Sequence, residues 1–470
     1  MVRIYLTILL LNNTMKQNKS SNKARDLWSS KLSFILASTG AAVGLGNIWK
    51  FPYEIASNGG SAFVVTYVIC LVMIGIPVLI AEMLLGKLGR ANPINTMKTL
   101  ATRSHATKKW QFLGWLSIIT LLLVLSFYSV VAGWSIIYAI ASIKGVFVGI
   151  DNAAVNNFWE GTINSPITMI SYHALFMLLT ISIVAKGITK GLEKANNIMM
   201  PMLFLFLIIL VCFSYNSSGF TKGLKYLLEF RYQDFNFTTI LKALGQTCFT
   251  LAIGAGCMLV YGSYVKEETN LGETASIIAL VNLAVGILTG LVIFPIIFSF
   301  NLEPIGGPGL IFQTLPVAFA NIKYGYLFGS MFFLLILFAA WTSSISMAEP
   351  IVIMLMEKTG LSRVSSAIIT GILTWSLGII SALSFNVWKN YSIFGKENFF
   401  ILITDLTTDF MLPLGILGFT IFAGWKLTQQ DYISGLKFHN LITVRVWHFL
   451  IKYLAPIFII LVTASTFFKF

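Results

Sequence analysis

The chain has 470 residues, of which 57% are hydrophobic and only 11% are charged, and its mean hydropathy is +0.82. Ordinary soluble domains carry about 25% charged residues, so the composition excludes a soluble globular protein and predicts an all-α polytopic membrane protein. The net charge of +14 does not indicate nucleic-acid binding, because the basic residues lie between apolar segments and form no single stripe.

Residues 1–31 are predicted to form a cytoplasmic amino-terminal segment. The apolar stretch Ile4–Leu11 is too short to span a bilayer, and a lysine-rich stretch follows it in place of a small-residue cleavage site, which disfavours a signal peptide. Met15 opens a more ordinary hydrophilic leader. Residues 1–14 are therefore either part of the protein or a gene-model extension, and the sequence leaves both open.

Eleven apolar segments have the length of about 20 residues that a helix needs to cross a bilayer. An interior amino terminus assigns about two thirds of the 32 lysines and arginines to the cytoplasmic side, which favours that orientation and an exterior carboxyl terminus. We expect one five-helix repeat over 32–214, a second over 238–426 and an eleventh helix over 445–468. The segments are 32–56, 60–87, 110–142, 166–186, 196–214, 238–264, 272–299, 325–356, 362–384, 398–426 and 445–468.

Glycines interrupt two of these segments. The first contains Gly40-Ala41-Ala42-Val43-Gly44-Leu45-Gly46-Asn47, and the sixth contains Ala252-Ile253-Gly254-Ala255-Gly256. Because five segments separate the breaks, they predict two inverted repeats with discontinuous helices one and six, which place a substrate and ion site near the bilayer midplane. Helix packing through the G-x-x-x-G spacing of Gly40 and Gly44 is the alternative for the first break.

The eighth segment carries three consecutive hydroxyls, Thr342-Ser343-Ser344, inside an apolar helix. Such hydroxyls either cross-link helices, which is their commoner use, or coordinate a cation. A dehydrated Na⁺ takes about five or six oxygen ligands. Thr342 and Ser343 could supply some of them, beside carbonyls that the break in the first segment frees.

Motifs of other function classes are missing from the sequence. It contains no P-loop, no G-x-G-x-x-G, no H-E-x-x-H and no G-x-S-x-G, and its four histidines are scattered. The four cysteines lie inside apolar segments, which is typical of small buried side chains and not of a disulfide framework. We therefore expect no enzyme activity.

The first segment resembles the signature first helix of the neurotransmitter:sodium symporter family. The matching residues are Gly40-Ala41-Ala42-Val43-Gly44-Leu45-Gly46-Asn47-Ile48-Trp49-Lys50-Phe51-Pro52-Tyr53. The resemblance covers nearly the whole chain, and eleven segments are similar to the bacterial amino-acid transporter branch. It continues through Gln246-Thr247-Cys248-Phe249-Thr250, Gly306-Gly307-Pro308-Gly309-Leu310-Ile311-Phe312 and Thr342-Ser343-Ser344-Ile345-Ser346.

This resemblance implies two sodium sites. An ion that shares a ligand with the substrate binds cooperatively with it, and the first site would share the substrate carboxylate. That site would use the carbonyl of Ala42, the side chains of Asn47 and Asn282, and the carbonyl and hydroxyl of Thr250. The second site would use the carbonyls of Gly40, Val43 and Ala339 with the hydroxyls of Thr342 and Ser343.

The resemblance also implies a substrate class. Monoamine transporters of the family carry an aspartate where this chain has Gly44, so we expect a substrate that brings its own carboxylate. Backbone N–H groups of Leu45 and Gly46 would hold that carboxylate at a helix N-terminus, together with the Tyr128 hydroxyl. An uncharged side-chain pocket favours a neutral, apolar or aromatic amino acid. The substrate set is Ala42, Gly44, Leu45, Gly46, Val124, Tyr128, Phe249, Thr250, Ala252, Ala255, Ser343 and Met347.

Charged residues resemble the gates of the family. Arg25 and Glu357 match the interior pair, with Trp28 and Tyr264 as supports. Lys50 replaces the usual outer arginine, and because lysine lacks the guanidinium fork we expect a looser outer gate. Its expected partner is Asp405, with Asp409 as the rival. Snorkelling of the charged side chains, or a static ion pair, is the alternative to a gate.

Chloride dependence is the last implication of the resemblance. Chloride-independent members carry an acid at the position of Asn282 or one turn later, where this chain has Gly286. We therefore expect chloride to supply the compensating negative charge, with Glu349 as an alternative source. The expected chloride residues are Tyr67, Gln246 and Thr250.

Together these features predict a sodium-coupled symporter in the plasma (inner) membrane that works by alternating access, with helices one, two, six and seven moving against the rest. The expected partners are an amino acid and the lipid bilayer, and the chain is a monomer or a homodimer. An exchanger or proton-coupled transporter of the same architecture should lack the Thr342-Ser343 and Asn47-Asn282 ligands. An amino-acid sensor that does not transport remains open.

Overall fold

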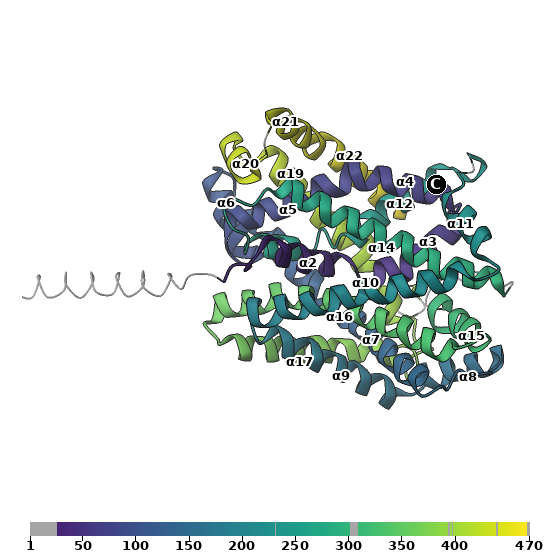
Figure 1. Ribbon diagram of the computed structural model, residues 1–470. Coiled ribbons are helices and arrows are strands. Elements are labelled where there is room, and N and C mark those ends of the chain that lie inside the picture. Colours follow the sequence, from purple (N-terminus) through teal and green to yellow (C-terminus); the bar gives the residue numbers. More distant parts are fainter. Residues whose placement is uncertain are drawn as a thin grey trace, which may run out of the picture.

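The computed structural model describes residues 26–230, 232–300, 309–392, 395–396, 398–438 and 440–467. In this part of the chain the long helices lie roughly side by side, with short helices at both ends of the bundle (Figure 1). Nine of the described helices are long and apolar enough to cross a membrane, and one bent pair makes a tenth. Most of the predicted 1–31 segment, including residues 1–14, lies outside the described residues.

The first predicted segment is the bent pair. Helix α2 (Lys31–Ala42) begins at Ser30, whose side chain accepts a hydrogen bond from the Ser33 N–H, and it ends where Val43 adopts an extended conformation. The chain re-enters a helix through the π-helical turn η1 (Gly46–Lys50) and α3 (Phe51–Ser57). The two halves are inclined by 53°. The predicted break in helix one is confirmed.

The sixth predicted segment is also broken, into α12 (Phe237–Thr250) and α13 (Cys257–Gly262). Between them Ala252, Gly254 and Gly256 have φ values of 51°, 89° and 78°. Left-handed backbone ends a helix, and glycine adopts it at little cost. The second predicted discontinuous helix is thereby confirmed.

The other helices follow the predicted segments closely. The second to fifth segments correspond to Ser61–Gly89, α7, α9 and Ile188–Tyr215, and the seventh to eleventh correspond to α14, α16, α17, Phe399–Trp425 and Leu441–Phe467. In the amino-terminal half the bounds are α4 (Ser61–Cys70), η2 (Leu71–Gly75), α5 (Ile76–Gly89), α6 (Pro93–Arg103), η3 (Lys108–Trp110), α7 (Gln111–Ile143), α8 (Asn152–Ile163), α9 (Pro166–Val184), η4 (Ile188–Glu193), α10 (Lys194–Tyr215), α11 (Phe220–Leu228) and η5 (Tyr232–Asp234). In the carboxyl-terminal half they are α14 (Leu271–Ser299), η6 (Leu310–Thr314), α15 (Leu315–Ala320), α16 (Gly325–Thr359), α17 (Arg363–Leu383), α18 (Phe399–Asp405), η7 (Leu406–Met411), α19 (Leu412–Trp425), α20 (Gln429–Leu436), α21 (Leu441–Phe449), η8 (Leu450–Leu454) and α22 (Ala455–Phe467).

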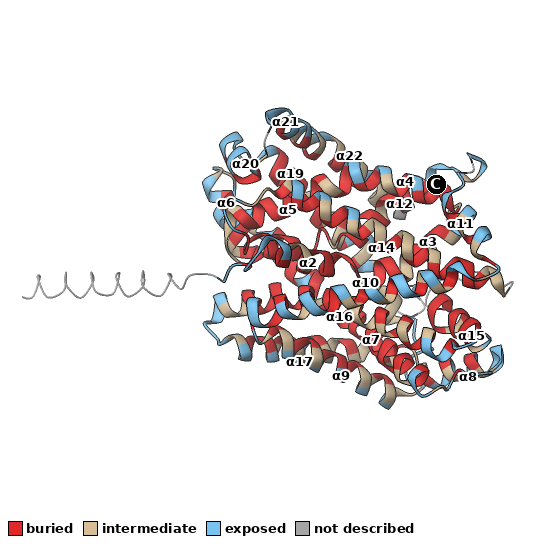
Figure 2. Ribbon diagram, in the orientation of Figure 1, coloured by how far each residue is buried: buried red, intermediate tan, exposed pale blue. Residues whose placement is uncertain are grey.

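The broken helices lie in the interior of the bundle. Helix α2 packs against α10, α14 and α16, and α16 packs along the length of α7. Buried residues concentrate along these inner helices, whereas exposed residues lie mainly at the two ends of the bundle and on its outer helices (Figure 2). The backbone groups that the first break frees therefore face protein and not lipid, as membrane-embedded irregular backbone requires.

Candidate functional site

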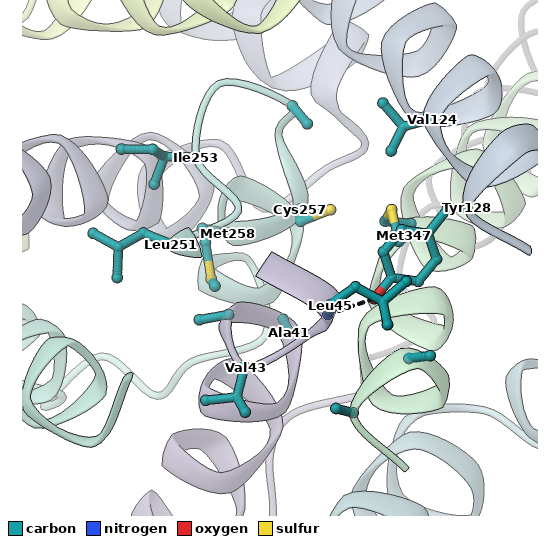
Figure 3. Close-up of a cluster of buried hydrophobic side chains, with 14 of the residues drawn as sticks. Ala41, Val43, Leu45, Val124, Tyr128, Leu251, Ile253, Cys257, Met258 and Met347 are labelled. Atoms are coloured by element: carbon teal, nitrogen blue, oxygen red, sulfur yellow. Dashed lines mark hydrogen bonds between the residues drawn. The ribbon is translucent and has the colours of Figure 1, made fainter. Parts of the chain in front are cut away.

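The break in the first helix is held against α7. The N–H of Leu45 donates to the Tyr128 hydroxyl at 3.2 Å, and Tyr128 and Met347 converge on Leu45 in Figure 3. A Cβ on Gly44 would lie 2.5 Å from Ser343 Oγ and 2.9 Å from the Tyr128 hydroxyl. No side chain therefore fits at position 44 unless Ser343 or Tyr128 moves.

Oxygen atoms from α2 and α16 gather beside this break. Ser343 Oγ lies 3.2 Å from the Gly40 carbonyl oxygen and 3.4 Å from that of Val43. Thr342 Oγ1 lies 3.1 Å from the carbonyl oxygen of Ala339. One hydroxyl proton cannot satisfy several carbonyls, so the group is rich in lone pairs. These oxygens, the set expected for the second sodium, fit a hard cation.

Two side chains of the set expected for the first sodium meet in the interior. Asn47 Nδ2 donates to the backbone carbonyl of Asn282 at 3.0 Å and to its side-chain oxygen at 2.8 Å. Asn47 Oδ1 is buried and has no hydrogen-bond partner among the described residues. Ala42 ends α2 and Thr250 ends α12. An acceptor without a donor at this position fits a cation ligand.

The residues expected to bind chloride adjoin the same asparagine. The Tyr67 hydroxyl lies 2.9 Å from Thr250 Oγ1 and accepts from Asn282 Nδ2 at 3.0 Å. Gln246 Nε2 donates to the Gly46 carbonyl at 2.8 Å. Gln246 therefore braces the first break, and one of its donors is already used.

Glu349, the expected alternative to chloride, is bound to other residues in the structure. Its carboxylate is bound on two sides, by the Tyr264 hydroxyl at 2.8 Å and by the guanidinium of Arg363. None of the expected chloride residues is among these partners. The charge of this carboxylate is therefore already paired with a partly buried arginine.

Two cavities reach the site. One of about 180 Å³ is lined by Leu45, Tyr128 and Phe249 from the expected substrate set, and one of about 540 Å³ shares Phe249 and Lys50 with it. Gly46 faces the Phe249 ring, which lies 3.0 Å from the place of a Cβ. The remaining expected residues lie in the surrounding interior: Ala42, Val124, Ala255, Ser343 and Met347 are buried, and Ala252 is half-buried in the second break.

Sequence reasoning missed several residues that line the smaller cavity. Phe127 and Val131 extend the face of α7 that carries Val124 and Tyr128, at the three-to-four-residue spacing of a helix. That spacing from Tyr128 could have identified them. Trp49 and Tyr53 follow Leu45 on the first segment at the same helical spacing, so that signal covers them too. Phe400, Thr404 and Thr408 come from the distant tenth segment and carry no local signal.

At the end of the bundle that holds α6, the expected gate residues are only partly described. Arg25 lies outside the described residues. Glu357 accepts hydrogen bonds from Asn92 Nδ2 at 2.6 Å and Asn95 Nδ2 at 2.9 Å. The backbone N–H of Trp28 donates to the backbone carbonyl of Tyr264 at 3.1 Å. The two expected support residues are therefore in contact.

The expected outer pair differs from the structure. Asp405 forms its ion pair with Lys396, at 2.5 Å, and not with Lys50. The bond to Asp405 raises the pKa of the exposed Lys396 ammonium. Lys50 lies over the Phe249 ring, with Nζ 4.6 Å from the ring centroid. The rival Asp409 lines the larger cavity together with Lys50.

A buried carboxylate holds the second break and was not predicted. Glu82 on α5 is fully buried, and its Oε1 accepts a hydrogen bond from the N–H of Gly254. Burying an acidic side chain within an apolar segment costs free energy, and such residues are therefore rare and have a partner or a function. Its place inside the 60–87 segment was the signal that could have identified it.

Comparisons with known proteins show the family and the fold. The sequence model of the sodium:neurotransmitter symporter family matches residues 25–161 and 153–470. The chain is 36% identical to the sodium-dependent transporter YhdH of Bacillus subtilis, over 93% of this chain and 96% of that protein. It is 34% identical to a sodium-dependent transporter of Haemophilus influenzae, over 96% and 100%. The crystal structure of MhsT in complex with L-phenylalanine is similar with a TM-score of 0.87 and 36% identity, over 94% of this chain and all of that one.

Proposed function

This chain belongs to the sodium:neurotransmitter symporter family and is a sodium-dependent, multi-pass membrane transporter, and on that premise we propose that it imports a neutral amino acid with an apolar or aromatic side chain. The observation that carries the proposal is the contact at the first break. Leu45 presents its N–H to an uncharged tyrosine hydroxyl, beside a glycine that leaves no room for an acidic side chain.

The polar end of the site suits a carboxylate. The N–H groups of Leu45 and Gly46 open the helical turn that continues into α3, and such an N-terminus carries partial positive charge. The Tyr128 hydroxyl, which Leu45 now binds, can turn to donate to a substrate oxygen. The resemblance assigns these same groups to the substrate carboxylate.

The apolar end of the site suits a neutral side chain. The smaller cavity is lined mainly by Leu45, Phe127, Val131, Phe249 and Phe400. A charged substrate side chain would lose its hydration there and would cost several kcal/mol to bury. That MhsT binds L-phenylalanine in its crystal structure supports the same substrate class.

We propose two sodium ions as co-substrates, one at each oxygen group. Asn47, Asn282 and Thr250 would hold the first beside the substrate carboxylate, and Thr342 and Ser343 would hold the second. Shared coordination would make amino acid and sodium bind cooperatively. A membrane potential of 100 mV contributes about 2.3 kcal/mol per charge moved, so two sodium ions with a zwitterion would gain about 4.6 kcal/mol.

The remaining expectations belong to the same proposal. The chain would lie in the plasma (inner) membrane with its amino terminus in the cytoplasm and its carboxyl terminus outside, as a monomer or a homodimer. The first, second, sixth and seventh helices of the two repeats, 32–214 and 238–426, would move against the rest in alternating access. Chloride near Tyr67, Gln246 and Thr250 would balance the sodium charge.

The test is uptake by the purified protein in liposomes. Labelled neutral amino acids are offered under an inward Na⁺ gradient, with K⁺ replacing Na⁺ as the control. We expect uptake that requires Na⁺ and is lost in Thr342→Ala and Asn47→Ala. Thr359→Ala, which changes an exposed threonine on the same helix α16, is the matched control.

Two outcomes would contradict the proposal. Equal uptake in K⁺ and Na⁺ would favour an exchanger or a proton-coupled transporter of the same architecture. Binding of an amino acid without uptake would favour a sensor.

A further inference from the structure

Asn196 is a buried amide that the proposed transport site does not yet explain. It lies near the start of α10 and is completely buried. Its Nδ2 donates to the Leu192 carbonyl at 2.8 Å, whereas its Oδ1 has no hydrogen-bond partner among the described residues. Exchanging the two amide atoms would place Oδ1 against the Leu192 carbonyl and lose this bond, so the hydrogen-bond network supports the orientation.

The unpartnered oxygen lies against the first break. A Cβ built on Gly40 would overlap Asn196 Oδ1, and it would lie 3.1 Å from Thr342 Cβ and 3.3 Å from Met200 Sδ. Gly40 and Thr342 both belong to the proposed second sodium group. The oxygen therefore lies beside Gly40 and Thr342 of this group and comes from α10, whereas the five expected ligands come from α2, from Val43 directly after it, and from α16.

An amide oxygen is only an acceptor, so it needs a donor or a cation to offset the loss of water. Leaving it unpaired in the interior destabilises the folded protein. Thr39 Oγ1, which precedes Gly40 in the chain, is also buried without a partner among the described residues. Positive charge next to Gly40 would stabilise the negative end of the Asn196 dipole.

We propose that Asn196 is a sodium-positioning residue: its carboxamide oxygen stabilises the cation held by the Gly40 and Thr342 group and adds a contribution from α10. The inference rests on the proposed function, because it deepens the assignment of the second sodium site. It goes beyond the five ligands that the family resemblance implies.

The experiment measures sodium binding without transport. The purified full-length chain in detergent is titrated with NaCl, with choline chloride holding the ionic strength and chloride constant, and its thermal unfolding midpoint is recorded. A ligand that binds the folded state raises this midpoint with its concentration. Asn196→Leu, which keeps the size of the side chain but removes the oxygen, should raise the half-saturating Na⁺ concentration about tenfold.

Two further variants separate the oxygen from packing. Met200→Leu changes the other α10 side chain beside Gly40 and should leave the sodium response within about twofold of wild type. Asn196→Asp keeps an acceptor towards Gly40 whether or not the acid is protonated, so its response should remain within about threefold. If the Leu variant does not fold, Asn196→Ser is titrated, since a serine hydroxyl on a helix bonds back to its own turn and should show the same tenfold loss.

The outcomes distinguish this inference from the function itself. A wild-type chain without any sodium response would refute the proposed sodium coupling. A wild-type response that Asn196→Leu or Asn196→Ser leaves unchanged would overturn the inference alone. Combining Asn196→Leu with Thr342→Val gives a second check, because effects on one shared site should be strongly non-additive and independent effects should add.

Discussion

The hydroxyl of Tyr264 donates to Oε1 of Glu349 at 2.8 Å, and this bond joins the chain just after α13 to helix α16. The other carboxylate oxygen of Glu349 binds Arg363 at the start of α17. Glu349 is completely buried and Arg363 is 18% exposed. A buried acid thus neutralises an arginine and at the same time holds the end of the broken sixth helix.

We expect Glu349→Gln to destabilise the protein, because it leaves the Arg363 charge without its buried counter-charge. Breaking a buried ion pair typically costs about 3–5 kcal/mol, and the partial exposure of Arg363 reduces our expectation to about 2–3 kcal/mol. Thermal or denaturant unfolding in detergent measures the change. Glu273→Gln is the matched control, since its pair with Lys31 is about half exposed on both sides and should contribute under about 1 kcal/mol. Equal effects of the two substitutions would contradict the structural role of Glu349.

Gly44→Ala should strongly weaken amino-acid binding. The new Cβ would lie 2.5 Å from Ser343 Oγ, and both Ser343 and Tyr128 would have to move. Overpacking of this kind costs about 1–3 kcal/mol, which corresponds to a loss of affinity of about fivefold to somewhat over a hundredfold. Equilibrium binding of labelled substrate in saturating Na⁺ measures it. Gly161→Ala, whose Cβ would meet nothing within 4 Å, should bind like wild type.

Tyr128→Phe should reduce substrate affinity without preventing folding. A hydrogen bond to a charged group contributes about 1.5–3 kcal/mol, so we expect the dissociation constant to rise by at least about tenfold. Tyr138→Phe on the same helix is the control, because the Tyr138 hydroxyl is buried without a hydrogen-bond partner among the described residues. Isothermal titration with the substrate compares the two variants. Unchanged affinity in Tyr128→Phe would mean that the carboxylate lies elsewhere.

Replacing chloride by gluconate should lower sodium-driven uptake several-fold. The carboxylate of Glu349 binds Arg363. We therefore do not expect it to replace the chloride ion beside Tyr67, Gln246 and Thr250. The measurement is initial uptake in liposomes at constant Na⁺ and ionic strength. Uptake that does not depend on the anion would remove chloride from the proposed mechanism.

Much of the fold could be predicted because its signals are local. The length of each apolar stretch indicates a membrane segment. The second break is indicated by glycines, which adopt left-handed backbone at little cost. The expected ligands of both proposed sodium groups lie in the first, sixth, seventh and eighth segments, and the family resemblance singles them out. Asn196 could not be identified in this way, because an asparagine near the start of an apolar helix does not show which helix it faces.

The sequence by itself determined the class of protein, the eleven apolar segments and the two broken helices, because hydropathy and backbone freedom are properties of neighbouring residues. The tertiary structure alone decided which charges meet. Asp405 pairs with Lys396 and not with Lys50, and Glu349 pairs with Arg363. Such contacts depend on how each helix is rotated and how far it is shifted along its neighbours, and a charge in a sequence carries no record of either.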